Sequence, residues 1–324
     1  MLVIGYGSIG KRHVENLLKI PKTEVILFSK HKKSVKNVLT FSSLQKCISE
    51  NPDVAIIANN TNSHIGIAMK LAKLGIDLFI EKPLSNSSKD IFSLNKIVKN
   101  KKIVTQIGCN LRFHKCIKKI KAVIDKEKIG RIISVKVESG SYLPEWHPYE
   151  DYKKSYASRK SLGGGVVLTC IHEIDYMYWL FGDIKEVFSL TGKFSDLQIT
   201  AEDFSSTIIK FRNNIVGELH LDYFQRPGIR SCKIIGTKGT IYWDSVSNNV
   251  KLYDIKKEEW VKLYGIDKFD RNDMYKDELQ YFLKCVSEKK NSFNSIKDGI
   301  KTLQIALAIK KSSQQKKVVK IEKK

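Results

Sequence analysis

The chain begins with Met1–Gly10, MLVIGYGSIG, an apolar run that leads into three glycines with the spacing G-x-G-x-x-G. Val14 and Leu17 follow at helical spacing, so the glycines stand where a strand gives way to a helix. Glycines at such a junction permit a tight turn and a close backbone approach to a pyrophosphate. We therefore predict that this loop binds a dinucleotide cofactor through Gly5, Tyr6, Gly7, Ser8, Ile9 and Gly10.

The segments that follow alternate between strand-like and helix-like patterns. Strands are predicted at Glu24–Phe28, Asp53–Ala58, Ile76–Ile80 and Ile103–Ile107, with helices at Asn62–Leu74 and Ser87–Lys99. The run DVAIIA at Asp53–Ala58 is continuously apolar, which is typical of a parallel strand buried on both faces. Residues 1–110 thus predict an α/β domain of the Rossmann type, with a doubly wound parallel sheet.

Residues 111–324 predict a second domain of different construction. Strands are expected at Ile132–Glu138, Glu186–Thr191, Phe204–Phe211, Ile215–Phe224 and Ser231–Ile235, with helices at Cys116–Lys128, Asp273–Ser287 and Ile296–Lys311. Short strands joined by turns such as Arg212–Asn214 favour an antiparallel sheet. A length of 324 residues is suited to two such cores.

The net charge of +23 raises a nucleic-acid hypothesis, since phosphate neutralisation needs cations. Only 8 of the 57 basic residues are arginine, however, and the lysines are scattered along the chain. Base-edge and phosphate recognition usually relies on the planar fork of arginine. We interpret the excess as a lysine-rich solvated surface and expect no specific nucleic-acid partner.

The sequence favours a cytoplasmic protein with no membrane partner. No run approaches the roughly 18 apolar residues of a membrane span, and the first residues lack the layout of a signal peptide. The six cysteines form no C-x-x-C pair and no zinc-finger spacing with histidine. We expect reduced thiols and no metal site.

The end of the second strand bears on the choice of cofactor. NAD-preferring sites usually place Asp or Glu there to bind the ribose 2′-hydroxyl. This chain instead has Ser29-Lys30-His31-Lys32-Lys33, a hydroxyl followed by cations and no carboxylate. That pattern suits a 2′-phosphate, so we predict NADP in preference to NAD, with Ser29 and Lys30 in contact with it.

Two further motifs carry a family resemblance. Glu81-Lys82-Pro83 ends one predicted parallel strand, and Thr61-Asn62-Ser63-His64 follows the strand before it. Later, Gly163-Gly164-Gly165 precedes His172-Glu173-Ile174-Asp175. With the glycine loop, these motifs make the whole chain resemble the Gfo/Idh/MocA family, the group of glucose–fructose oxidoreductase and inositol dehydrogenase.

The resemblance implies an NAD(P)-dependent oxidoreductase that moves a hydride between the nicotinamide and a hydroxyl or keto carbon of a sugar, nucleotide sugar or sugar-like polyol. It also implies a C-terminal α/β domain over residues 111–324, built on a large, mostly antiparallel open sheet for substrate binding and oligomerisation. A homodimer or homotetramer is expected. Further cofactor contacts are expected from Asn59, Asn60, Thr61, His64, Glu81, Lys82 and Asn110.

Two residues are candidates for catalysis. An ammonium at Lys82, at the carboxyl end of a parallel strand, would hydrogen-bond a substrate oxygen and stabilise its charge. Imidazole titrates near neutral pH, so His172 would take or return the hydroxyl proton. Asp175, three residues on, is a candidate to orient the imidazole.

The sequence departs from the family pattern just before this histidine. Many relatives place an Asp three or four positions earlier, which gives a Lys–Asp–His trio, whereas this chain has Leu168 and Thr169. Thr169 can hydrogen-bond a substrate hydroxyl but cannot act as a carboxylate base.

Aromatic and polar residues point to carbohydrate binding. The stretch 142–156 supplies rings for sugar C–H faces together with polar rims. We expect substrate contacts from Arg112, Trp146, His147, Tyr156, Thr169 and His172. Tyr-Leu-Pro-x-Trp and His-Glu-Ile-Asp also resemble a branch found beside bacterial surface-sugar genes. A packed loop is the alternative interpretation of this stretch.

A second class of function is a non-catalytic dinucleotide-binding regulator, because the same fold serves transcriptional control. The presence of both Lys82 and His172 argues against it. Such a regulator would bind cofactor without turning over any sugar.

Overall fold

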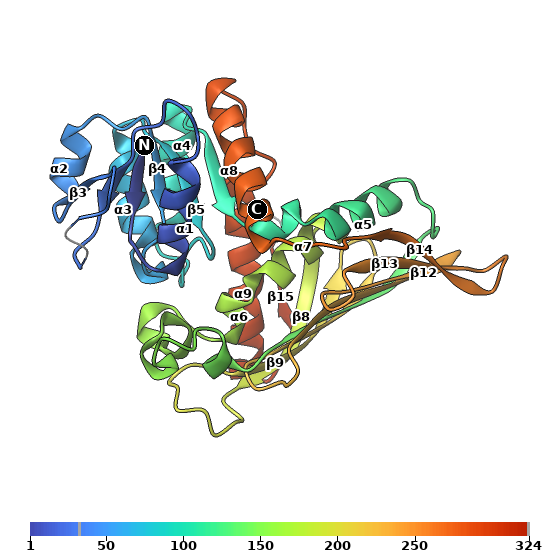
Figure 1. Ribbon diagram of the computed structural model, residues 1–324. Helices are drawn as coiled ribbons and strands as arrows, with labels where there is room; N and C mark the ends of the chain where they lie inside the picture. The colour runs from blue at the N-terminus through green and yellow to red at the C-terminus, as the bar shows by residue number, and fades with distance from the viewer. Residues whose placement is uncertain (32–33, 323–324) are drawn as a thin grey trace. The chain divides into compact units, whose positions relative to one another are not determined.

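The computed structural model describes residues 1–31 and 34–322 (Figure 1). The chain packs into two compact units. Unit 1 comprises Met1–Cys109 and Asn272–Leu303, and unit 2 comprises Asn110–Arg271 and Gln304–Lys324. One segment of the C-terminal third, Asn272–Leu303, therefore packs with the N-terminal residues. The sequence analysis had assigned every residue after 110 to the second domain.

Unit 1 contains a six-stranded parallel sheet in the order β3-β2-β1-β4-β5-β6. The strands are β1 (Leu2–Ile4), β2 (Ile26–Phe28), β3 (Leu39–Phe41), β4 (Val54–Ile57), β5 (Asp77–Glu81) and β6 (Thr105–Gly108). The predicted Rossmann sheet is confirmed; only β3 was not anticipated, because its three residues include a polar Thr40 and are partly exposed. The strand order reverses between β1 and β4, which is where such sheets bind dinucleotides.

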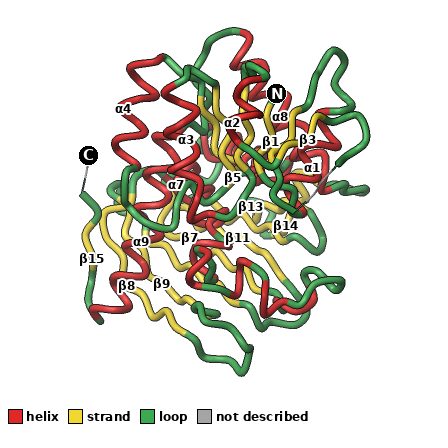
Figure 2. The backbone as a smooth tube through the Cα atoms, turned by 90° about the vertical axis from the view of Figure 1, so that its left-hand side faces the viewer, coloured by secondary structure: helices red, strands yellow, loops and turns green. Residues whose placement is uncertain are grey.

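Helices α1 (Ser8–Leu17), α2 (Leu44–Ser49), α3 (His64–Lys73) and α4 (Ile91–Lys101) connect these strands. Figure 2 shows α3 and α4 side by side. The predicted cap after α3 is present: Gly75 has a φ of +82° and its N–H donates to the Ala72 carbonyl. Helix α4 begins four residues later than predicted, because Asp90 adopts a left-handed φ of +59°.

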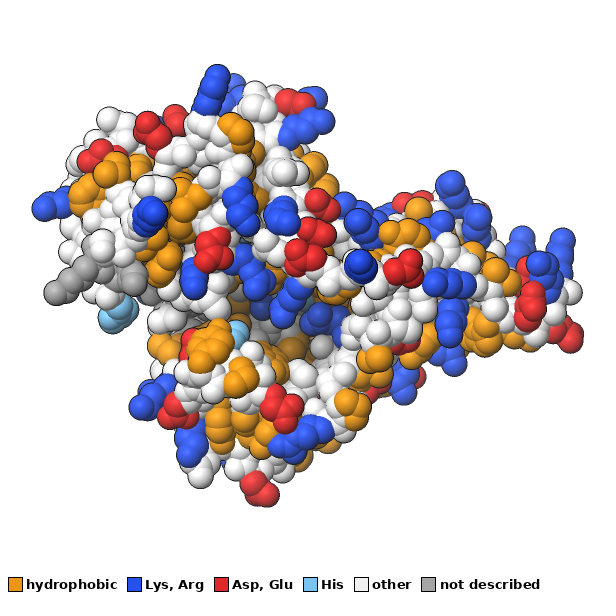
Figure 3. All heavy atoms as spheres, viewed as in Figure 1, with side chains coloured by type: hydrophobic (Ala, Val, Ile, Leu, Met, Phe, Trp, Pro, Cys, Tyr) orange, Lys and Arg blue, Asp and Glu red, His pale blue; other side chains and the backbone are white. Residues whose placement is uncertain are grey.

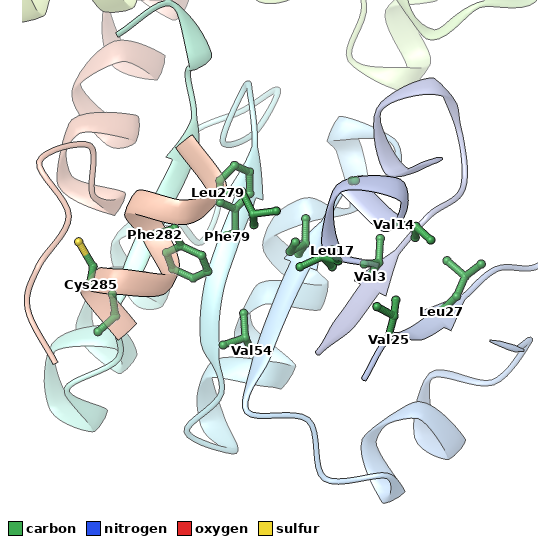
Figure 4. Close-up of a cluster of buried hydrophobic side chains, with 13 residues drawn as sticks. Val3, Val14, Leu17, Val25, Leu27, Val54, Phe79, Leu279, Phe282 and Cys285 are labelled. Atoms are coloured by element: carbon green, nitrogen blue, oxygen red, sulfur yellow. The ribbon is translucent and has the colours of Figure 1, made fainter. Parts of the chain in front are cut away.

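Helix α8 (Arg271–Ser287) packs on this sheet from far along the chain. Figure 4 shows its Leu279, Phe282 and Cys285 in one apolar cluster with residues of β1, β5 and α1. Asn272 and Asn16 exchange reciprocal side-chain amide hydrogen bonds of 3.2 and 3.0 Å, which fix α8 to α1. The helix itself was predicted, but an amphipathic pattern does not say which sheet it will cover.

Unit 2 contains a nine-stranded sheet in the order β14-β13-β12-β11-β7-β10-β9-β8-β15, antiparallel except between β7 and β10. Its strands are β7 (Ile132–Gly140), β8 (Ile184–Gly192), β9 (Phe204–Phe211), β10 (Val216–Asp222), β11 (Ile229–Gly236), β12 (Gly239–Asp244), β13 (Asn249–Asp254), β14 (Glu259–Gly265) and β15 (Val319–Lys320). The large, mostly antiparallel sheet is confirmed. Strands β12–β15 were not predicted; β13 and β14 contain exposed polar residues that weaken their alternation, and β15 has only two residues.

One face of this sheet is covered by helices. These are α5 (Lys115–Asp125), α6 (Val166–Thr169), α7 (Ile171–Phe181) and the later part of α9 (Ile296–Gln315). The other face leaves apolar side chains exposed on β8 and β9: Phe188 is 47% exposed, Leu190 60% and Ile208 49%.

Figure 3 shows lysine and arginine side chains interspersed with acidic ones over the visible face, rather than gathered in one basic patch. Among the described residues, no helix is long and apolar enough to cross a bilayer. The six cysteines are free and buried.

Candidate functional site

The glycine loop lies at the switch point of the parallel sheet, where the ends of β1 and β4 meet. Gly5 has a φ of +96°, and a Cβ there would stand 2.8 Å from the Ala58 carbonyl oxygen. A Cβ on Gly10 would stand 2.2 Å from the Gly5 carbonyl oxygen, so this glycine allows α1 to pack on the loop. These two glycines are required by the fold itself.

Gly7 has a different role. Nothing lies within 4 Å of a Cβ built on it, and it caps α1 without any side-chain hydrogen bond. The first turn of α1 contains no acidic residue, so the helix itself places no negative charge beside its N–H groups. This end of α1 therefore fits a dinucleotide pyrophosphate.

The two kinds of glycine can be separated by matched substitutions. We expect Gly10→Ala to lower the free energy of unfolding by about 1–3 kcal/mol, because backbone must move to admit the methyl group. Gly7→Ala should leave thermal unfolding unchanged yet weaken NADPH binding by about tenfold, or about 1.4 kcal/mol. Thermal denaturation and NADPH fluorescence titration measure the two effects. Equal destabilisation by both changes would contradict the assignment.

The end of β2 presents the predicted ribose-side residues. Ser29 is buried; its N–H donates to the Phe41 carbonyl, and its hydroxyl accepts the His31 N–H at 3.4 Å. Lys30 is exposed beside it. Lys32 and Lys33, which contributed to the NADP prediction, lie outside the described residues.

His64 lies at the start of α3, where the ends of β4 and β5 come together. Its Nδ1 is 3.0 Å from the Pro83 carbonyl oxygen and its Nε2 is 2.9 Å from the Asn59 carbonyl oxygen. Burial lowers the pKa of His64, although both carbonyl contacts oppose that shift. The sequence suggested a cofactor ligand, but both ring nitrogens are occupied by backbone. Thr61 is also buried, and Asn60 is exposed.

Glu81 is likewise engaged inside unit 1. Its Oε1 lies 2.7 Å from His13 Nε2, and both residues are buried. The carboxylate also occupies the space in which a Cβ of Gly108 would stand, at 2.9 Å. This geometry favours a structural partner over the cofactor contact expected from the sequence. Lys82, the next residue, is half-buried.

In unit 2, His172 lies in the first turn of α7 and is buried. The Asp175 carboxylate forms a two-pronged ion pair with Arg112, with Nε–Oδ2 and Nη2–Oδ1 distances of 2.8 Å, and its role in orienting His172 stays a prediction. Arg112 is fully buried in η2 (Asn110–Phe113), as is Asn110. We expected Arg112 to contact substrate, but its pairing favours a role in holding α7.

Other predicted substrate residues gather around Tyr223, which the sequence analysis did not single out. The Trp146 ring packs edge-on against Tyr223 at 5.3 Å, and its Nε1 donates to the Ser141 hydroxyl. Burial raises the pKa of the Tyr223 hydroxyl well above its ordinary value, and a hydrogen bond with Thr169 opposes the shift. Thr169 and Trp146 thus contact a common phenol.

The glycine triplet holds the neighbouring loop against α6. A Cβ on Gly164 would stand 2.1 Å from the Tyr156 carbonyl oxygen, and one on Gly165 would meet the Glu202 carboxylate at 2.3 Å. Tyr156 itself is 37% exposed at this loop. His147 lies apart from this packing and accepts or donates a 3.1 Å hydrogen bond with the Tyr149 hydroxyl.

The structure therefore forms two groups of candidate residues, one in each unit. Lys82 belongs to unit 1 and His172 to unit 2, so their joint action stays a prediction. Sequence reasoning missed His13, Tyr223 and Arg230, whose Nε hydrogen-bonds the buried Glu173 carboxylate. His13 stands three residues after Gly10, the third glycine of the loop, so the two lie on the same face of α1. That spacing was the available signal that His13 faces the sheet.

A six-stranded parallel sheet with a glycine loop at its switch point defines a dinucleotide-binding protein of the oxidoreductase class. Residues 1–109 match the model of the oxidoreductase family with an NAD-binding Rossmann fold, and residues 121–321 match the family's C-terminal alpha/beta domain. The chain belongs to the Gfo/Idh/MocA family.

Named relatives extend over almost the full length. The chain is 26% identical to a myo-inositol 2-dehydrogenase of Thermotoga maritima over 99% of this chain and 98% of that protein. It is 26% identical to a scyllo-inositol 2-dehydrogenase (NAD(+)) of Bacillus subtilis, covering 94% and 91%. A levoglucosan dehydrogenase solved with NADH shares the fold, with a TM-score of 0.87, 20% identity and coverage of 100% and 99%.

Proposed function

We propose that this protein is an NAD(P)-dependent dehydrogenase or reductase acting on a CH–OH group of a sugar, nucleotide sugar or sugar-like polyol. One observation carries the proposal: Gly7, where nothing lies within 4 Å of a Cβ built on the backbone, and the half-buried Lys82 both lie at the carboxyl edge of the same parallel sheet. The named relatives that act on inositols and levoglucosan support the substrate class.

The nicotinamide, when bound, supplies or accepts the hydride. The glycine loop and the first turn of α1 would hold the pyrophosphate, and Ser29 and Lys30 would bind on the ribose side. Lys82 hydrogen-bonds the substrate oxygen and stabilises the negative charge that develops there. His172 takes the hydroxyl proton during oxidation and returns it during reduction. Trp146 and Tyr156 supply the aromatic faces and rims for the sugar ring.

A spectrophotometric screen at 340 nm tests the proposal. Purified protein is mixed with NAD or NADP and myo-inositol, scyllo-inositol, levoglucosan, common hexoses or nucleotide sugars. We expect turnover with at least one of them. Tight NADPH or NADH binding with no turnover of any would favour a non-catalytic regulator and contradict the proposal.

The proposed preference for NADP rests on Ser29 and the exposed Lys30 at the end of β2. We expect NADPH to bind about tenfold more tightly than NADH, a difference of about 1.4 kcal/mol. Lys30→Glu should remove that preference, because a carboxylate repels the 2′-phosphate and suits a 2′-hydroxyl. Fluorescence titration measures both affinities. Lys99→Glu, an equal charge change on exposed α4, is the control, and tighter NADH binding by the unaltered protein would contradict the preference.

We propose a homodimer or homotetramer formed through the uncovered sheet face of unit 2. Phe188 on β8 pairs directly with Ile208 on β9, and Leu190 follows on the same face, so the exposed apolar side chains are contiguous. Ile208→Asp should shift the protein to the monomer in light scattering after size exclusion. Val246→Asp, in a turn where Val246 is 75% exposed, should not. A monomeric unaltered protein would refute the proposal.

The location proposed for the protein is the cytoplasm. Six free thiols without a disulfide are typical of a reducing compartment.

A further inference from the structure

The segment Glu81-Lys82-Pro83 is held on both sides of Lys82 by buried histidines. On the Glu81 side, His13 Nε2 lies 2.7 Å from the carboxylate oxygen; the His13 side chain is fully buried and the Glu81 side chain is 7% exposed. His13 is itself fixed by ring contacts with Phe79 of β5, at 5.1 Å, and Tyr275 of α8, at 6.4 Å. The pair has little freedom to rearrange.

The Glu81 carboxylate also lacks room to move away from His13. Its atoms lie about where a side chain at position 108 would begin, since a Cβ on Gly108 would stand 2.9 Å from Glu81 Cδ. Glu81 is the last residue of β5 and pairs with Gly108 of β6 in the ladder. The absence of a side chain at Gly108 is thus what admits this carboxylate at the sheet edge.

On the other side of Lys82, His64 binds the backbone. Its ring bridges the carbonyl oxygens of Pro83 and Asn59, at 3.0 and 2.9 Å. Because burial lowers its pKa, the ring is neutral near pH 7 and donates its single N–H to one of the two carbonyls. One N–H···O hydrogen bond and one close contact therefore link the segment after β5 to the segment after β4 through this ring.

We propose that His13, Glu81 and His64 are positioning residues that fix the backbone on either side of Lys82 and thereby set the place of its ammonium. Glu81 and Lys82 are adjacent in the chain, so Glu81 acts on Lys82 through the backbone that they share. The inference rests on the catalytic role proposed for Lys82. It replaces the cofactor contacts that the sequence suggested for Glu81 and His64.

Competitive acetylation tests this positioning without any substrate. The full-length protein is treated with a trace of acetic anhydride, and mass spectrometry reports how fast the peptide with Lys82 is modified relative to the exposed Lys99. We expect Glu81→Ala and His64→Ala to accelerate modification of Lys82 several-fold, because its backbone is released. Glu81→Gln and His64→Asn retain a hydrogen-bonding group and should restore most of the original rate.

Asp77→Ala is the matched control. Asp77 and Glu81 are the first and last residues of β5, and both are buried carboxylates with a cationic or imidazole partner. Asp77 accepts the Val104 N–H and pairs with Lys289 at 2.9 Å, at the end of the strand remote from Lys82. Its loss should destabilise unit 1 without changing the acetylation of Lys82.

NADPH titration and steady-state kinetics complete the test. If Glu81 only positions Lys82, the dissociation constant for NADPH should be unchanged in Glu81→Gln and Glu81→Ala. With the substrate found in the screen, kcat of Glu81→Ala should fall by about tenfold or more. Unchanged acetylation in both alanine variants, equal acceleration in Asp77→Ala, or a large loss of NADPH affinity would each overturn the inference. A Lys82→Ala variant that keeps full activity would instead refute the proposed function and leave the acetylation result standing.

Discussion

Lys82→Ala should lower kcat by about 10²–10⁴-fold while the unfolding temperature stays near that of the unaltered protein. Lys82 is half-buried directly after β5, at the edge of the sheet where open α/β folds bind their ligands. In the proposed function an ammonium there would stabilise charge on the substrate oxygen, and a methyl group could not replace that interaction. Because the Lys82 side chain contributes little to the hydrophobic core, the fold should tolerate its loss.

Steady-state rates at 340 nm measure this effect, with Lys99→Ala on the exposed face of α4 as the control. His172→Gln provides the comparison from unit 2. If both residues serve one proton-transfer step, the variant with both Lys82→Ala and His172→Gln should have a kcat only slightly below that of the less active single variant. A rate for Lys82→Ala within about threefold of the original would show that the lysine is not part of the chemistry.

The part of the fold that could be predicted is the part that local pattern determines. Met1–Gly10 predicts a strand, a loop and a helix because Gly5 and Gly10 each meet a steric demand there, and the continuous apolar runs predict buried parallel strands. The return of α8 to unit 1 could not be predicted. Its apolar face indicates burial, but the partner surface is chosen by contacts of residues such as Phe282 with strands more than 200 residues earlier.

The candidate site divides in the same way. Residue types and motifs indicated Lys82, His172 and the glycine loop, whereas the ion pairs among buried charged side chains could not be predicted from the sequence. Asp175 was considered as a partner of His172 because the two are three residues apart, yet its carboxylate binds Arg112, 63 residues away. Sequence spacing reports neighbours on one helix only, and a buried ion pair between elements is set by tertiary packing.

That ion pair gives the second large effect. Arg112 and Asp175 are both buried and meet through two hydrogen bonds of 2.8 Å, so removing either one takes a two-pronged charge partner from the other inside the protein. Removing one partner of such a pair costs about 3–5 kcal/mol, whereas replacing both by apolar groups is often close to neutral. We therefore expect Arg112→Met and Asp175→Leu each to lower the free energy of unfolding by about 3–5 kcal/mol.

The double variant distinguishes two causes of the lost stability: a buried charge without its partner, and the loss of side-chain packing. If the uncompensated charge dominates, Arg112→Met with Asp175→Leu should be more stable than either single variant, which is a strongly non-additive cycle. Urea denaturation followed by circular dichroism measures all three. Lys121→Met breaks an i,i+4 pair with Asp125 on α5 and should cost less than about 1 kcal/mol. Additive losses in the double variant, or single losses as small as that of Lys121→Met, would mean that the pair does not hold α7 and that Arg112 remains available for the substrate.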